Sequence, residues 1–186
     1  GDKKSYQPDL TSYDYDAPLT EGADMTWKYE KIREVAKKYR EVPDLKVSNN
    51  TKKAYGTVTF TEGVSIYDAL SQIGNVVKEN DAPMTMEDLD VDYGFVFYQS
   101  QINQVKSLEI PHCKDRGYVF VDQKRQCIVQ HGSEVPCTLT DQKGNLDILV
   151  ENMGRLNCGN DFFEKKGITD VVKGDGAEIK NWKMTG

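Results

Sequence analysis

The sequence predicts a mainly β protein, in which an antiparallel, jelly-roll-like β-sandwich follows a single βα unit. Two observations support this fold class. Before residue 43, one segment repeats its apolar residues with the period of an α-helix. From residue 55 onward the period changes to 2, in short segments that follow one another roughly every 8–12 residues. Gly and Asn turns separate these segments, as is typical of antiparallel sandwiches.

Residues 1–42 are expected to form the βα unit. Residues 11–16 alternate in polarity as a short strand does, and Pro18 ends this strand. Asp24 or Thr26 then caps a helix expected over 26–41, because both side chains can accept a hydrogen bond from the first helical turn. The apolar stripe of this helix consists of Ile32, Val35, Ala36 and Tyr39.

Residues 43–54 are polar, begin with a proline that bars helix continuation, and are interpreted as a linker. The sandwich domain is therefore predicted over 55–186. Residues 65–73 fit neither a helix nor a strand clearly. The expected strands are 55–61, 93–102, 106–110, 117–122, 126–130, 136–140, 145–151, 168–172 and 179–184.

Composition limits the class of protein. The 186 residues carry a net charge of −6, with a pI of about 5.0 and a mean hydropathy of −0.65. A length of this kind suits one domain, or one domain and part of another. No basic patch indicates nucleic acid as a partner, and no apolar run is long enough to predict a membrane span. The first residues also lack the apolar core of a signal peptide.

Four cysteines, at 113, 127, 137 and 158, include no CxxC pair, so a zinc site is not expected. They allow three disulfide pairings, among which the sequence does not choose, and buried free thiols are an equal alternative. Asn49 begins a glycosylation sequon in a polar segment, which gives weak support to a secreted protein.

The segment Tyr13-Asp14-Tyr15-Asp16 is the first candidate for a binding site. On a strand both tyrosines lie on one face and both aspartates on the other. A tyrosine offers an aromatic face and a hydroxyl, which suits a sugar ring, although such pairs more often serve packing. The two aspartates approach from one side, so they do not fit a catalytic pair that flanks a glycosidic bond. We expect them to hydrogen-bond neighbouring backbone.

Other polar groups are better explained by structure than by chemistry. The segment Glu151-Asn-Met-Gly-Arg155 fits a turn held by side-chain hydrogen bonds more readily than a sugar site. Asp115-Arg116 fits a structural ion pair or turn. His112 and His131 have no partner in a recognisable nucleophile motif, so neither is expected to be catalytic.

Several separate motifs, in order, resemble glycoside hydrolase family 35, the β-galactosidases, and most of all the animal lysosomal-type enzymes. The segment from Thr11 to Asp24 is similar to the eighth strand and following loop of the catalytic (β/α)₈ barrel, and 26–41 to its last helix. The sandwich continues the resemblance in Tyr93-Gly-Phe-Val-Phe-Tyr98, Asp115-Arg-Gly-Tyr-Val119, Leu146-Asp-Ile-Leu-Val-Glu-Asn-Met-Gly-Arg155 and Lys166-Gly-Ile168.

This resemblance implies a retaining β-galactosidase that removes terminal β-linked galactose from glycans or glycolipids. It implies that Tyr15, or in second place Tyr13, contacts the galactose and that Asp14 holds the strand end. Glu21 and Asp24 match positions that look structural. The family's acid/base and nucleophile glutamates come from earlier barrel strands and match no residue here, so no catalytic residue is expected in this chain.

The same resemblance implies no metal or organic cofactor. The expected partners are a β-galactoside and the remainder of the barrel, and the expected compartment is lysosomal or extracellular. A second reading is a non-catalytic sandwich module that binds carbohydrate or a partner protein, which an exposed aromatic pair on one face would favour. A third is a degenerate gene product without activity.

Overall fold

The computed structural model describes residues 15–44, 47–132, 135–157, 159–160 and 162–186. They belong to two units, one reaching to Gly63 and the other running from Val64 to Gly186. Each unit is described by itself below. The division falls nine residues after the linker predicted over 43–54, inside the segment predicted as the sandwich.

Among its described residues, the first unit contains one helix, α1 (Trp27–Ala36), none of whose residues is buried. Thr26 is its N-cap residue, but the Thr26 hydroxyl donates to Pro18 O at 2.7 Å and makes no cap hydrogen bond. The predicted helix is therefore confirmed but is shorter than 26–41. Of the strand predicted over 11–16, residues 11–14 lie outside the described residues, and the remaining two form a turn.

The strand predicted over 55–61 is wrong. These residues are exposed and belong to no helix or strand. Their alternation was genuine, but a strand also needs a neighbour to satisfy its backbone groups. Within the described part of the chain, no strand is paired with this segment.

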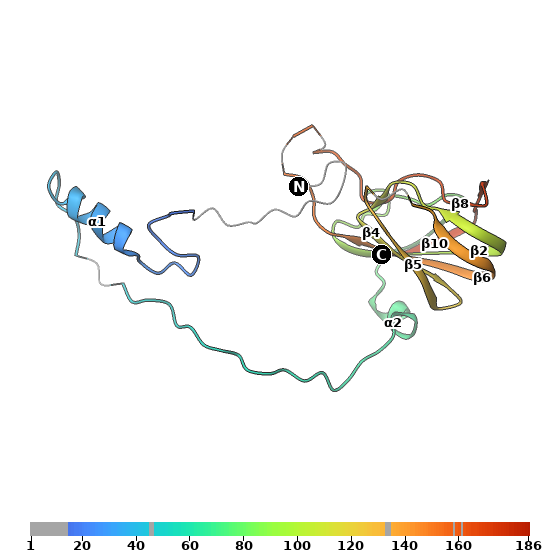
Figure 1. Cartoon of the computed structure of the whole chain (residues 1–186), viewed down its shortest axis with the longest axis horizontal. Coiled ribbons are helices and arrows are strands. Elements are labelled where there is room, and N and C mark those ends of the chain that lie inside the picture. The colour runs from blue at the N-terminus through green and yellow to red at the C-terminus, as the bar shows by residue number, and fades with distance from the viewer. Residues whose placement is uncertain (1–14, 45–46, 133–134, 158, 161) are drawn as a thin grey trace. The chain divides into compact units, whose positions relative to one another are not determined.

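The second unit is built on an antiparallel eight-stranded sheet, with a two-stranded sheet beside it (Figure 1). The main strands run in the order β1-β10-β2-β6-β4-β5, and β8 and β9 extend the β2 edge. The smaller sheet pairs β3 with β7. The strands are β1 (Val77–Asn80), β2 (Gly94–Glu109), β3 (Cys113–Lys114), β4 (Arg116–Val121), β5 (Lys124–Gln130), β6 (Cys137–Asn152), β7 (Gly167–Ile168), β8 (Lys173–Gly174), β9 (Ala177–Glu178) and β10 (Trp182–Thr185).

Two long strands, β2 and β6, form the spine of this sheet. Each has 16 residues and joins two strands that the sequence predicted separately. Their pairing shifts register between Ile102 and Ser107, where the alternation of the sequence is also interrupted. Such irregularities bend a strand without ending it. The mainly β, antiparallel sandwich predicted from the sequence is thus confirmed.

The two faces of the spine are covered differently. One face packs into the main core, where Val96, Tyr98, Ile148 and Val150 are fully buried. The other face carries Phe97, which lies under a second helix, α2 (Ile66–Ile73).

Helix α2 is the element that the sequence left ambiguous. Ser65 caps it by accepting a hydrogen bond from Asp68 N at 3.2 Å. Tyr67 stands edge-on to Phe97, with 5.5 Å between ring centroids, and so attaches the helix to the sheet. Gly74 ends the helix, where a Cβ would meet the Thr185 side chain at 2.3 Å. The small residue therefore allows the helix to approach β10.

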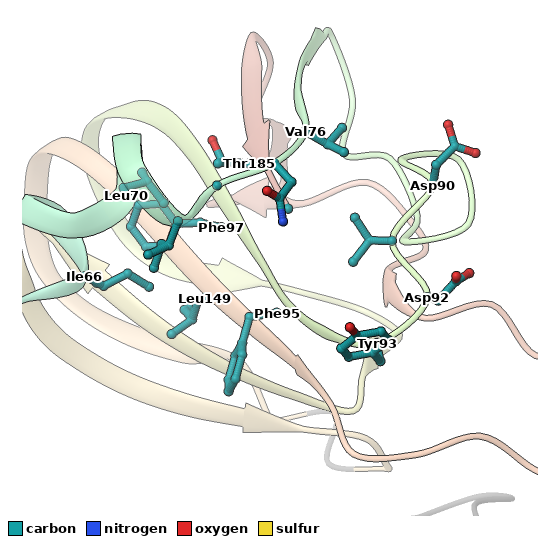
Figure 2. Close-up of a pocket in the computed structure, with 15 residues that line it drawn as sticks. Ile66, Leu70, Val76, Asp90, Asp92, Tyr93, Phe95, Phe97, Leu149 and Thr185 are labelled. Carbon is teal, nitrogen blue, oxygen red and sulfur yellow. The ribbon is translucent and has the colours of Figure 1, made fainter.

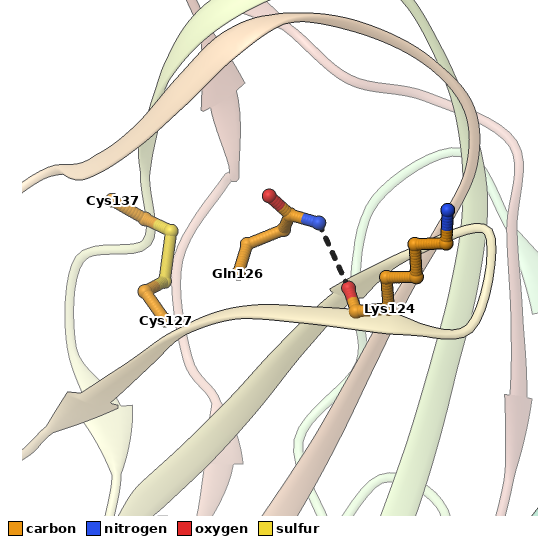
Figure 3. The surroundings of a disulfide bond; sticks show 4 residues. All are labelled: Lys124, Gln126, Cys127 and Cys137. Carbon is orange, nitrogen blue, oxygen red and sulfur yellow. Dashed lines mark hydrogen bonds between the residues drawn. A yellow bond between two sulfur atoms is a disulfide. The ribbon is translucent and has the colours of Figure 1, made fainter.

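A disulfide joins Cys127 in β5 to Cys137 at the start of β6 (Figure 3). It closes the segment between these two strands, and Gln126 donates to Lys124 O at 2.9 Å beside it. The Cys127–Cys137 bond is one of the disulfides that the sequence left open. Cys113 is a free, buried thiol.

Candidate functional site

The family resemblance predicts a substrate site in the segment around Tyr15. The Tyr15 side chain is 77% exposed, in a turn shared with Asp16. Lys28 from α1 holds this turn, with its amine 3.2 Å from the Asp16 carboxylate. Tyr13 and Asp14 lie outside the described residues. The predicted roles of all three therefore stay predictions.

A tight loop connects this turn to α1. Leu19 and Met25 pair as an isolated antiparallel bridge, and Thr20 N donates to Asp24 O at 2.9 Å. Asp24 N in turn donates to the Thr20 hydroxyl at 3.1 Å. These bonds satisfy backbone groups that a loop would otherwise leave to water, and so they define the path of the chain between Tyr15 and the helix.

The Asp24 carboxylate links this loop to a later segment of the same unit. It forms an ion pair with Lys52 and accepts from Asn50 N at 2.7 Å. The Lys52 contact, followed by the Asn50 bond, holds the pKa of Asp24 below its usual range. A carboxylate occupied in this way acts as an anchor and is unsuited to proton transfer. The contacts fit the structural position that the resemblance implies for Asp24.

A buried charge network lies at one end of the sandwich unit. The Lys166 amine is 2.7 Å from Asp115 Oδ1, and both side chains are essentially inaccessible. The same amine lies 3.6 Å from Glu164, which also pairs with Lys114. His131 Nδ1 stands 3.9 Å from Asp115 and 3.8 Å from Glu164. Charges inside a protein need such partners, because water no longer solvates them.

This network shows how the motif at Asp115 is used. The sequence suggested that Asp115-Arg116 forms a structural ion pair or a turn. In the structure Asp115 lies at a bend between β3 and β4, and its ion pair is made with Lys166. Asp115 Oδ2 also accepts from Met153 N at 2.7 Å. The neighbouring Cys113 thiol has its pKa raised to about 12 by burial and by the Asp115 charge. It is therefore an unreactive thiol.

The segment from Glu151 to Arg155 is a braced strand end, as predicted. Gly154 N donates to the Asn152 side chain at 3.0 Å, which makes the turn. Arg155 donates to Asp92 O at 3.1 Å and pairs with Glu87 at 2.5 Å. These bonds join the end of β6 to the loop before β2, and they occupy the Arg155 guanidinium.

Among the residues that the structure describes, no three His, Cys, Asp or Glu side chains are grouped so as to hold a metal ion. None of the described helices is long and apolar enough to cross a membrane.

Comparison with known families gives two matches along the chain. Residues 83–186 match the family described as β-galactosidase, first all-beta domain. Residues 1–39 match glycosyl hydrolases family 35. The first match covers more than half of the chain and includes every strand from β2 onward. The chain belongs to the β-galactosidase family of glycosyl hydrolases, family 35.

Individual relatives agree. The chain is 34% identical to a β-galactosidase of Bos taurus over 96% of its own length, and 34% identical to that of Homo sapiens over 99%. It is also 34% identical to β-galactosidase 8 of Oryza sativa subsp. japonica over 98%. The chain spans 28–30% of the length of these three curated relatives.

Proposed function

We propose that this chain is the part of a retaining β-galactosidase that carries the end of the catalytic barrel and the first β-sandwich. The whole protein would hydrolyse terminal β-linked galactose from glycans or glycolipids, with both catalytic glutamates outside this chain. The observation that carries the proposal is the order of the two family matches. A catalytic-family match at 1–39 precedes a β-galactosidase β-domain match at 83–186.

Tyr15 is our candidate for contact with the galactose, with Tyr13 as the second choice and Asp14 as a support for the strand end. Loops that follow the strands of a (β/α)₈ barrel open onto its active-site face. The described part of the site supports this role, because the Tyr15 ring is exposed and the turn that bears it is held by Lys28. Its ring and hydroxyl suit the CH face and the OH groups of a sugar.

The remainder of the barrel is the proposed partner of the first unit. Helix α1 has no buried residue. The exposed large side chains of the helix and its C-terminal turn are Trp27, Ile32, Val35 and Tyr39. Exposed apolar side chains clustered in this way are typical of a surface that packs against another element.

A lysosomal or extracellular location is proposed from two features. The Cys127–Cys137 disulfide is typical of an oxidising compartment. The sequon at Asn49 lies in an exposed segment, where a glycan can be attached.

The test compares this chain with the longer native protein purified from its source, using lactose and a nitrophenyl β-galactoside. We expect hydrolysis by the longer protein, with the β-anomer of galactose formed first, and no hydrolysis by the 186-residue chain. Hydrolysis by the chain alone would show that it contains its own catalytic residues, and would overturn the proposal. An inactive longer protein would do so too.

Tyr15 is tested in the same longer protein. Loss of one hydroxyl contact in Tyr15→Phe is expected to lower kcat/KM about 3- to 10-fold, as for a hydrogen bond worth roughly 0.5–1.5 kcal/mol. Tyr55→Phe is the matched control, because Tyr55 is similarly exposed in the same unit and is not assigned to the site. Equal kinetics for the two variants would remove Tyr15 from the site.

A further inference from the structure

A groove of about 370 Å³ lies beside α2 in the sandwich unit (Figure 2). Its apolar floor includes Ile66 and Leu70 from the helix, and Phe97 and Leu149 from the sheet. The volume is within the range of about 300–1,000 Å³ that is usual for small-molecule sites. The groove lies wholly within the second unit, so its shape depends only on residues from Ile66 to Gly186.

Two aromatic residues stand along this groove. Tyr93 is 84% exposed and Phe95 is 48% exposed, at the point where the chain enters β2. Phe95 lies in β2 two residues before Phe97, so these two share a face of the sheet, and Tyr93 lines the same groove from the bend just before the strand. Figure 2 shows Phe95 and Tyr93 at separate points along the edge of the groove. Aromatic side chains usually gain most from burial, so an exposed pair indicates a surface that binds something.

Polar groups surround the apolar floor and are available to a ligand. In the part of the chain that the structure describes, no hydrogen bond or ion pair is made by the side chains of Asn75, Asp92 or Tyr93. Asp90, further along the rim, faces the amine of Lys78 at 3.7 Å. The rim therefore offers an amide, a carboxylate and a phenol, which can donate to and accept from hydroxyl groups.

We propose that this groove is a carbohydrate-binding site that takes a neutral hexose unit of a glycan, such as a β-galactosyl residue. A sugar ring has one apolar CH face, which the Tyr93 and Phe95 rings can cover. Its hydroxyls suit the amide and carboxylate on the rim. The two aspartates disfavour an anionic ligand such as a nucleotide or a sialic acid. The site is independent of the proposed hydrolysis, because it needs no catalytic glutamate and no residue of the first unit.

The experiment uses the 186-residue chain with ¹⁵N labelling, titrated with lactose, methyl β-galactoside and, as a chemically unrelated additive, glycerol. We expect saturable shifts from the two sugars and not from glycerol, confined to the amides of Asn75 and residues 90–95. Tyr93→Ala is expected to weaken binding about tenfold, because it removes the stacking surface. Phe163→Ala is the matched control, since Phe163 is similarly exposed and lies outside the groove.

Asp92→Asn tests the polar rim and keeps the proposal open to refutation if Tyr93→Ala fails to fold. It is expected to weaken binding while leaving the spectrum of the free protein largely unchanged. Three results would overturn the proposal: no shifts at millimolar sugar, shifts located away from the groove, or equal weakening by Tyr93→Ala and Phe163→Ala. Concentration-dependent self-association that protects Tyr93 would also overturn it, by showing that a second copy occupies the groove. None of these results bears on galactoside hydrolysis by the longer protein.

Discussion

Lys166 offers the sharpest test of how the sandwich unit is stabilised. The substitution Lys166→Met keeps most of the side-chain volume and removes the ammonium. Asp115 then loses its 2.7 Å partner, while its carboxylate stays in a fully buried position. Removing one partner of a buried ion pair costs about 3–5 kcal/mol, because the other charge is left without compensation.

The structure favours the lower end of that range. Asp115 keeps the hydrogen bond from Met153 N, and Glu164 keeps its ion pair with Lys114. We therefore expect a loss of about 3 kcal/mol. In a domain of this size such a loss lowers Tm by roughly 6–12 °C.

The assay is urea unfolding of the 186-residue chain, followed by tryptophan fluorescence, because Trp182 is fully buried in the core. The control is the double variant Lys166→Met/Asp115→Asn, which removes both charges and should recover part of the lost stability. A single-variant loss below about 1 kcal/mol would refute the reasoning, since that is the value of an exposed pair. No recovery in the double variant would show that the loss comes from packing.

Three further changes test other parts of the unit. Replacing Cys127 and Cys137 together by serine should lower stability by about 3 kcal/mol, because the short loop between them becomes free in the unfolded chain; calorimetry of oxidised and reduced protein checks this. Gly117→Ala should cost about 1–3 kcal/mol, because its Cβ would meet two side chains at 2.8 and 2.9 Å; a loss no larger than that of Gly63→Ala, at an exposed position where a Cβ meets nothing within 4 Å, would contradict it. Burial raises the pKa of Glu87, but hydrogen bonds from Arg155 and the backbone outweigh it and leave the pKa below its usual value. The stability from this contact is present above the unfolded pKa of about 4.3 and is lost as pH falls through the folded pKa. Glu87→Gln should therefore lower the stability at pH 7 and make the stability fall less at acid pH. Unfolding midpoints measured across that pH range check this.

The sequence predicted the strongest strands because their residues alternate over a long stretch. Both halves of β6 and the first half of β2 were found in this way, since one face of each is buried in the core. Helix α2 was not recognised, because eight residues give barely two turns of periodic signal. Strand β1 was missed because its pattern is mostly exposed at the sheet edge.

The wrong strand prediction at 55–61 and the failure to predict the charge network have a common cause. Each depends on a partner far away in the sequence, which local patterns do not reveal. The strand prediction lacked a described neighbour, and the Asp115 motif lacked Lys166, which is 51 positions away. The groove beside α2 likewise brings together residues of the helix, β2 and β6.

The pairing of β1 with β10 has a consequence for biosynthesis. Val77 pairs with Thr185, so the first strand of the sheet meets the last one. At about 5–20 residues per second, a ribosome needs roughly 5–20 s to make the chain between them. During that interval β2 has no neighbour on its β10 side, and the core lacks Trp182 and Met184. The nascent sandwich therefore presents an unpaired strand edge, which is a template for pairing with another chain, and it is completed only after Thr185 has left the ribosome.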